Sequence, residues 1–225
     1  FTLFQNKMVK VVVTGFSSWE GSAGENPSEL VVEKLKAKQW PTDFQFRFAT
    51  VPVVFEEMVG HVMKVVNDFE ADVVIMLGEY PGRAMITVER LAQNLIDATR
   101  YGLSDNVGDR PINRKVVQDG PVALAATVPI RSMTLAMRQV GVPSDISDSA
   151  GTFGCNLLFY GVLHSVKPGT RVGWLHLPAL PSTASLDINL GMPSMSLDTQ
   201  TQGVIAAIIS ACGDESEALT VRTKL

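Results

Sequence analysis

The sequence predicts a single α/β domain, an α/β/α sandwich in which helices cover both faces of a central, largely parallel, twisted sheet. Three observations support this fold class. Short apolar segments that are typical of buried strands alternate with segments whose apolar residues recur at helical spacing. No internal repeat, low-complexity stretch or linker divides the 225 residues. Hydrophobic residues make up 46% of the chain and charged residues 19%, which is enough apolar material for a large core.

The strands are expected at four apolar segments. Residues 9–14 (VKVVVT) and 72–77 (DVVIML) are nearly continuous apolar runs, as in strands that are buried on both faces. Residues 46–51 and 171–177 show the alternation that is also typical of strands. We expect the domain to span residues 8–225 and residues 1–7 to be an upstream segment. Helical spacing recurs between the strands, at residues 27–35, 55–69, 130–140, 155–166 and 196–212.

The composition excludes several classes of partner and site. The formal net charge of −4 argues against nucleic acid or an anionic membrane as a partner, and no apolar run reaches the roughly 18 residues of a membrane span. Two cysteines and three histidines occur without a CxxC or HExxH pattern, so we expect no metal site and no disulfide framework. No signal peptide is evident. A cytoplasmic protein in a reducing compartment is expected.

Cys155 is the first candidate for chemistry because of its position. It lies in residues 149–156 (SAGTFGCN), directly before the apolar run at 157–163. Small, flexible residues followed by an amphipathic run predict a tight turn that leads into a helix. At a helix N-terminus, free backbone N–H groups and the helix dipole stabilise a thiolate and an oxyanion. The alternative is an ordinary buried cysteine that packs as a small hydrophobe.

A cysteine nucleophile needs an imidazole within hydrogen-bond reach, and the predicted elements separate the three histidines. His164 is nine residues after Cys155 on the same helix, about half a turn away and ~13 Å along the axis, so it cannot pair. His61 lies in the middle of a predicted helix, where a solvated side chain is expected. His176 closes an alternating strand just before Pro178, at the edge of the sheet where sites form. We therefore favour His176 as the base.

A third group should orient the imidazole, as a carboxylate does in catalytic triads. Spacing alone does not choose among the acidic residues near the predicted strand ends. Glu89 by itself fits a surface residue beside the capping Thr87. The candidates are Glu79, Glu89, Asp97 and Asp148.

Several segments together resemble pyroglutamyl peptidase I, the cysteine peptidases that remove N-terminal 5-oxoproline from peptides. The resemblance extends from Met8 almost to the C-terminus. It implies a catalytic triad of Glu89, Cys155 and His176, with Glu89 resting on the resemblance alone. The segments that carry it are residues 13–16 with 26–28, residues 86–92 with Asn94, residues 149–156, and residues 176–181.

The resemblance also implies a substrate site. The family holds the lactam ring between aromatic side chains; Phe16 and Trp19 match two of those positions, and Phe153 is a third candidate. Stacking would hold the ring faces while a few polar groups contact its edge. Arg83 matches the arginine that ends the family's glycine-rich loop, and we expect it to support the oxyanion region or the geometry of that loop.

The chain departs from the family pattern in three places. Residues 78–83 read GEYPGR where the family usually has GQAGGR, so Glu79 replaces a glutamine and becomes our candidate for the ring edge. Residues 19–21 read WEG where a Phe-Gly-Gly is usual, and Gly154 replaces the valine that normally precedes the nucleophile. None of these changes removes a catalytic group. They affect recognition of the ring.

The implied activity is hydrolysis of the bond after an N-terminal pyroglutamyl residue through a thioester acyl-enzyme, without metal or organic cofactor. Pyroglutamylated peptides are the expected partners, and the resemblance implies a homo-oligomer, commonly a tetramer. One alternative is an inactive module that binds pyroglutamyl peptides on the same fold. Another is a nucleoside-cleaving enzyme or phosphorylase on a related scaffold, although no glycine-rich phosphate loop is visible.

Overall fold

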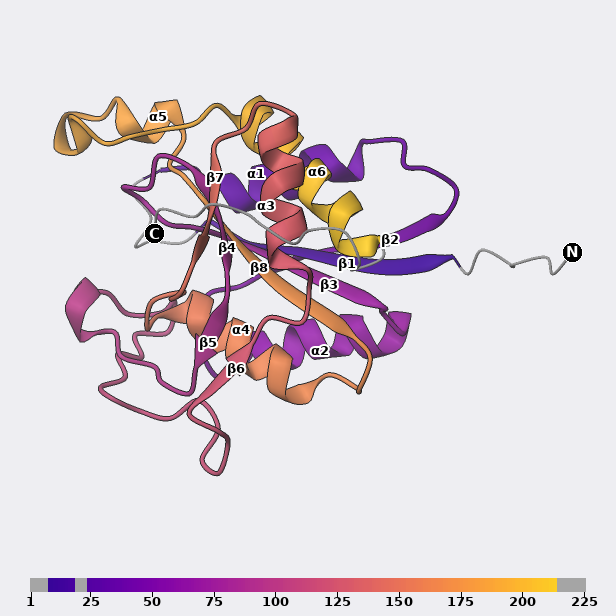
Figure 1. Cartoon of the computed structure of the whole chain (residues 1–225). Helices are drawn as coiled ribbons and strands as arrows, with labels where there is room; N and C mark the ends of the chain where they lie inside the picture. Colours follow the sequence, from indigo (N-terminus) through magenta and orange to yellow (C-terminus); the bar gives the residue numbers. More distant parts are fainter. Residues whose placement is uncertain (1–7, 19–23, 214–225) are drawn as a thin grey trace, which may run out of the picture.

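A six-stranded sheet forms the centre of the molecule (Figure 1). The computed structural model describes residues 8–18 and 24–213. The strands lie in the order β2-β1-β3-β8-β4-β7, and neighbouring strands are parallel except for the pair β4 and β8. A separate ribbon pairs β5 (Leu91–Gln93) with β6 (Ala123–Ala125). The sheet consists of β1 (Val9–Phe16), β2 (Phe44–Val51), β3 (Val73–Glu79), β4 (Ile86–Glu89), β7 (Ser144–Ser147) and β8 (Arg171–Leu177).

Helices cover both faces of the sheet, which confirms the predicted α/β sandwich. One face packs against α1 (Pro27–Lys36), α3 (Ile130–Gln139) and α6 (Leu197–Cys212), and the other against α2 (Met58–Phe69) and α4 (Gly154–Ser165) (Figure 1). The short α5 (Pro181–Ala184) lies on an arm that projects from the end of β8. Two 3₁₀ turns complete the elements, at Thr99–Tyr101 and Asp187–Asn189.

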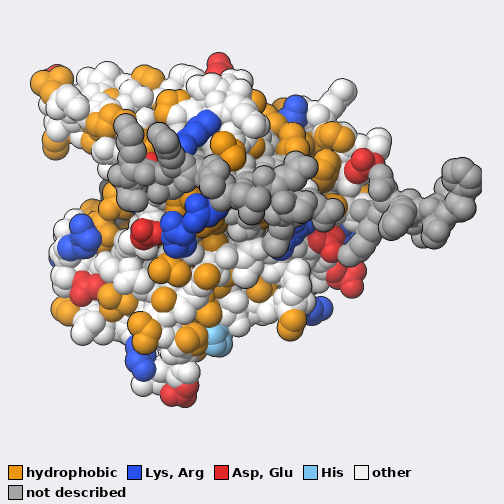
Figure 2. Space-filling model, in the orientation of Figure 1, with side chains coloured by type: hydrophobic (Ala, Val, Ile, Leu, Met, Phe, Trp, Pro, Cys, Tyr) orange, Lys and Arg blue, Asp and Glu red, His pale blue; other side chains and the backbone are white. Residues whose placement is uncertain are grey.

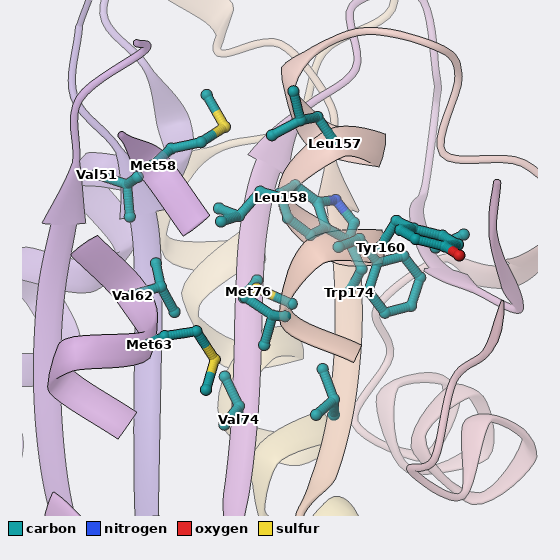
Figure 3. Packing of buried hydrophobic residues seen from close by; sticks show 14 of the residues in the cluster. Val51, Met58, Val62, Met63, Val74, Met76, Leu157, Leu158, Tyr160 and Trp174 are labelled. Carbon is teal, nitrogen blue, oxygen red and sulfur yellow. The ribbon is translucent and has the colours of Figure 1, made fainter. Parts of the chain in front are cut away.

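The core between the sheet and helices α2 and α4 contains the largest buried side chains. Met76 on β3 and Trp174 on β8 face Met58 of α2 and Leu158 and Tyr160 of α4 (Figure 3). All five are buried, as the near-continuous apolar runs of the strands require. This packing fixes the first turn of α4 over the ends of β3 and β8, where the polar side chains of the site emerge.

Local sequence signals explain where the first helix begins. The Asn26 side chain caps α1 by accepting from the backbone N–H of Ser28, and Pro27 occupies the first turn, where no backbone donor is needed. The Ser28 hydroxyl in turn accepts from the backbone N–H of Phe16 at 2.9 Å. The start of α1 therefore holds the end of β1 in place.

The predicted strands and helices are all present, with ends shifted by a few residues. The short strands β4 and β7 and the β5–β6 ribbon were not predicted. The ribbon closes a long loop, residues 94–122, that contains several Asp, Gly and Pro residues. β4 is the more important addition, because it runs antiparallel to β8 and carries Glu89 into the site.

Candidate active site

The site begins with two neighbouring residues on the parallel strands β3 and β8. Gly78 pairs in register with His176, so both positions face the same side of the sheet, the side covered by α4. The His176 side chain is fully buried. Because Gly78 has no side chain, the Trp174 ring can lie against it; a Cβ there would lie 2.8 Å from Trp174 Cζ2.

Glu89 reaches the same imidazole from the antiparallel strand β4. Thr87 lies opposite His176, and Glu89 is two residues farther along on the same face, which makes it a diagonal neighbour. Its Oε1 lies 2.7 Å from His176 Nδ1, and the carboxylate is fully buried. The pairing fixes the ring orientation and leaves His176 Nε2 as the nitrogen available for proton transfer. Among the described residues, this Nε2 has no hydrogen-bond partner.

Arg83 also hydrogen-bonds to the Glu89 carboxylate. Its Nη1 donates to Glu89 Oε1 at 2.6 Å and also to the Thr87 hydroxyl, while Nη2 donates to Ser147 Oγ at 3.2 Å. The guanidinium lies 4.0 Å from the centre of the Tyr80 ring. Arg83 is therefore a partner of the Glu89 carboxylate, and its contact with Tyr80 lies within the loop whose geometry we expected it to support.

Cys155 is the second residue of α4, as the sequence predicted. The preceding turn contains Gly151 at φ +81°, where a Cβ would lie 2.5 Å from the Tyr101 hydroxyl, so only glycine fits. The same hydroxyl accepts from the backbone N–H of Thr152. Phe153 is the N-cap residue, and its side chain makes no capping hydrogen bond.

The thiol and the imidazole line the same cavity, which has a volume of about 380 Å³. A Cβ placed on Gly78 would lie 3.0 Å from Cys155 Sγ, so the sulfur sits directly over the glycine that neighbours His176. Apolar side chains form most of the wall. The lining residues are Phe16, Asn26, Val53, Glu79, Tyr80, Pro81, Tyr101, Leu103, Ala150, Phe153, Gly154, Cys155, His176, Thr183 and Met192.

Burial sets the resting protonation states of the thiol and the imidazole. Burial, reinforced by the charge of Glu89, raises the pKa of Cys155 to about 12. Burial of the thiol therefore acts against the helix N-terminus, which stabilises a thiolate. Burial also lowers the pKa of His176, although its hydrogen bond to Glu89 acts in the opposite direction. Both shifts favour the neutral forms of the thiol and the imidazole.

Glu89 remains ionised in this setting. Burial opposes its charge, but the hydrogen bond and charge of His176, together with the Arg83 guanidinium, hold its pKa below the ordinary value. A buried anion beside Nδ1 stabilises the imidazolium that forms when Nε2 takes a proton. The arrangement suits general base catalysis by His176.

The other residues considered from the sequence lie outside the cavity lining. His61 is exposed on α2, and His164 is exposed near the end of α4, where its ring stacks on Tyr160. Asp97 bonds to Thr99, and Asp148 forms an ion pair with Arg90. Cys212 is the last residue of α6, a helix on the opposite face of the sheet.

Comparison with known proteins agrees with this geometry. The family model for pyroglutamyl peptidase matches residues 9–214. A pyrrolidone-carboxylate peptidase of Mycobacterium bovis is 49% identical over 207 residues, which cover 91% of this chain and 92% of that protein. The chain belongs to the pyroglutamyl peptidase family. A pyrrolidone-carboxylate peptidase of Vibrio vulnificus is 37% identical over 93% of this chain and 96% of its own. The crystal structure of pyroglutamyl peptidase I from Bacillus amyloliquefaciens has a TM-score of 0.86 at 31% identity, with 95% and 99% of the two chains covered.

The family resemblance named four substrate-binding residues, and the structure places three of them. Phe16, Glu79 and Phe153 all line the cavity that contains Cys155 and His176. Trp19 lies outside the described residues. Glu79, which replaces the glutamine usual in the family, lies at the end of β3, next to the site glycine.

Sequence reasoning missed several residues that hold this site of the pyroglutamyl peptidase fold together. Asn156 is fully buried; its side chain donates to the carbonyls of Gln93 and Leu95 and accepts from the Gln93 N–H, which ties α4 to the β5 segment. Tyr80 packs edge-on against His176, with ring centres 5.2 Å apart. A polar residue directly after a candidate nucleophile was the available signal for Asn156. Tyr80 had none.

Proposed function

We propose that the protein is a cysteine peptidase that removes an N-terminal pyroglutamyl residue from peptides. The observation that carries this proposal is the buried Glu89–His176 pair in the cavity that also contains Cys155. Family membership supports the cysteine-peptidase class and the removal of N-terminal pyroglutamate.

Cys155 is the nucleophile and His176 is its base. Because burial raises the pKa of the thiol, attack on the pyroglutamyl carbonyl is coupled to transfer of the thiol proton to Nε2 of His176. The imidazolium then gives that proton to the leaving amine, and a thioester remains on Sγ. His176 next takes a proton from water, which attacks the thioester and releases 5-oxoproline and the free thiol.

The oxyanion is stabilised at the start of α4. Backbone N–H groups of the first turn point out of the helix end, and the side chain of the N-cap residue Phe153 does not cap them. Together with the positive end of the helix dipole they suit the charge that develops on the carbonyl oxygen.

The pyroglutamyl ring binds in the apolar part of the cavity. Phe16 and Phe153 supply flat apolar surface, and the Phe153 ring is held by edge contact with Phe55 at 5.1 Å. Glu79 contacts the polar edge of the lactam. Trp19, outside the described residues, is proposed as a further ring contact by the family pattern.

Arg83 acts through Glu89 as a positioning residue. It shares Oε1 with His176 Nδ1, so the carboxylate is fixed between two donors. Its positive charge also lowers the pKa of both Glu89 and His176, which keeps the imidazole neutral and ready to accept a proton.

The protein is proposed to act in the cytoplasm as a homotetramer. Family membership and large exposed hydrophobic side chains support self-association. Among these are Ile188 and Leu190 on the arm around α5, which are 88% and 78% exposed, and Figure 2 shows hydrophobic side chains gathered on this arm. No helix in the described part of the chain is long and apolar enough to cross a membrane. The molar mass in solution, measured by size-exclusion chromatography coupled to light scattering, tests the assembly.

Hydrolysis of a pyroglutamyl-coumarin amide beside the unmodified glutamyl amide tests the function. We expect release of coumarin from the first substrate and none from the second, because the charged, open-chain glutamyl group does not suit an apolar slot. Binding of a pyroglutamyl peptide without any turnover would favour the inactive binding module. Equal turnover of both amides would contradict recognition of the ring.

A further inference from the structure

The Glu79 carboxyl group lines the cavity, and one of its two oxygens is buried there. The side chain follows Gly78 at the end of β3, and its Oε1 is buried; among the described residues no hydrogen-bond partner for this atom is found. A negative charge on a half-buried carboxyl group with one unpartnered, buried oxygen is unfavourable, because no donor compensates it at that oxygen. The group is placed to bond to a ligand.

The surroundings of Glu79 do not favour a negative charge. Phe16, Val53 and Phe153 form the apolar wall, and none of the described lining residues is a lysine or an arginine. The charge of Arg83 is directed at Glu89, behind the Tyr80 ring. Burial raises the pKa of Glu79 to about 7, so the neutral acid is present in a large fraction of molecules at neutral pH.

The other titratable groups that face Glu79 come from four elements. They are Cys155 on α4, His176 on β8, Tyr80 in the same loop and Tyr101 in the 3₁₀ turn, with Glu89 of β4 beyond the imidazole. An ionised Glu79 adds to the effects that raise the pKa of Cys155. A negative Glu79 therefore opposes the thiolate and the oxyanion, whereas a neutral Glu79 does not.

The polar edge of a lactam matches a carboxylic acid. The ring amide is cis, so its N–H donor and C=O acceptor lie side by side. A neutral carboxyl group offers one O–H donor and one C=O acceptor at the same spacing, whereas a carboxylate offers acceptors only. A glutamine amide offers both functions at every pH.

We propose that Glu79 binds the pyroglutamyl ring as a neutral carboxylic acid, whose O–H donates to the ring carbonyl while its C=O accepts from the ring N–H. This inference rests on the proposed function for the identity of the ring. Ionisation of Glu79 removes the O–H donor. The ring carbonyl, which is an acceptor, then faces a carboxylate oxygen that is also an acceptor. Ring recognition is therefore lost as the pH rises through neutrality, and Glu79→Gln preserves it.

The first test compares kcat/KM for a pyroglutamyl-coumarin amide between wild type and Glu79→Gln from pH 6 to pH 9. The ratio of the two values cancels the shared ionisations of Cys155 and His176. We expect near-equal activity at pH 6, and a variant advantage that grows by up to about tenfold per pH unit above pH 7. Glu56→Gln, which neutralises a carboxylate that is 79% exposed, should leave the ratio to wild type constant. A constant ratio for Glu79→Gln as well would overturn the proposal.

The second test needs neither a variant nor catalysis. Binding of 2-pyrrolidone, the bare lactam, to the wild-type protein is followed by ligand-detected NMR at each pH. We expect a dissociation constant that is constant below pH 6 and rises by up to about tenfold per unit above pH 7. A constant or falling dissociation constant would show that the ionised carboxylate binds the ring and would overturn the proposal. Because this readout does not depend on turnover, an absence of peptidase activity contradicts the proposed function without deciding the state of Glu79.

Discussion

The Nδ1 atom of His176 lies 2.7 Å from Oε1 of Glu89, across the antiparallel pair in a sheet whose other neighbouring strands are parallel. Reversal of β4 brings its last residue back along β8, so a carboxylate meets an imidazole that already faces α4. A parallel β4 would direct its end away from the middle of β8. The direction of one short strand thus assembles the proposed triad.

Alanine substitution of His176 should reduce turnover far more than substitution of either of the other two histidines. His176→Ala is expected to lower kcat by several orders of magnitude, because one imidazole serves as both base and acid. His61→Ala and His164→Ala remove exposed side chains and should keep turnover within about twofold. Steady-state kinetics on folded variants measures this, and a collapse of turnover in folded His164→Ala would contradict the geometry.

Arg83 should control the pH dependence through His176. Arg83→Met removes a positive charge that lowers the pKa of the imidazole, so this pKa rises and the acid limb of kcat/KM moves to higher pH. We expect about a tenfold loss of kcat/KM near pH 6, and partial rescue of the profile by Arg83→Lys. The measurement is a pH profile from 5 to 9. A uniform loss at every pH would indicate a merely structural role for Arg83.

Glu79 should also affect stability in a pH-dependent way. The pKa of Glu79 is about 7 in the folded protein, against an ordinary value of 4.5. Between these two pH values the folded chain retains a proton that the unfolded chain releases. Stability contributed by Glu79 is therefore present at low pH and lost as the pH rises through the window. Glu79→Gln should raise the free energy of unfolding by about 1–3 kcal/mol at pH 8 and little at pH 4.5. Urea unfolding at the two pH values checks this, and an equal effect at both would count against a buried acid.

Two glycines in packed helices should respond in opposite directions to alanine. A Cβ on Gly161 of α4 would lie 2.4 Å from Val59 Cγ2 of α2, so Gly161→Ala should cost about 1–3 kcal/mol of stability. A Cβ on Gly60 of α2 meets no atom within 4 Å. Gly60→Ala should therefore stabilise by about 0.5–1 kcal/mol through helix propensity. Urea denaturation of both variants measures the difference, and destabilisation of equal size in both would contradict the close approach of the two helices.

Much of the fold follows from apolar periodicity, but its short strands do not. The runs that form β1, β3 and β8 are apolar enough to predict buried parallel strands, and Cys155 was correctly placed at a helix start. β4 and β7 contain four residues each, with polar residues that are buried only through tertiary hydrogen bonds. Segments of this length carry no period that separates them from a loop.

In the site, too, some residues could be predicted from the local sequence, whereas others depend on contacts between distant segments. Helix geometry separates His164 from Cys155 in the sequence, and in the structure His176 lines the cavity with Cys155 whereas His164 is exposed. Glu89 was reached only through resemblance, since its contact with His176 depends on the antiparallel register of β4. The raised pKa of the Cys155 thiol was also missed, because helix position is visible in the sequence whereas burial of a sulfur between α4 and β3 is not.

The most direct test of the central claim is detection of the acyl-enzyme on Cys155. The protein is mixed with an activated pyroglutamyl ester, quenched with acid and examined by intact-protein and peptide mass spectrometry. We predict one pyroglutamyl group on the peptide that contains Cys155, its absence in Cys155→Ala together with a loss of at least about 1,000-fold in turnover, and an unchanged result in Cys212→Ala. Retained turnover in Cys155→Ala, or an adduct that maps to another residue, would contradict the account.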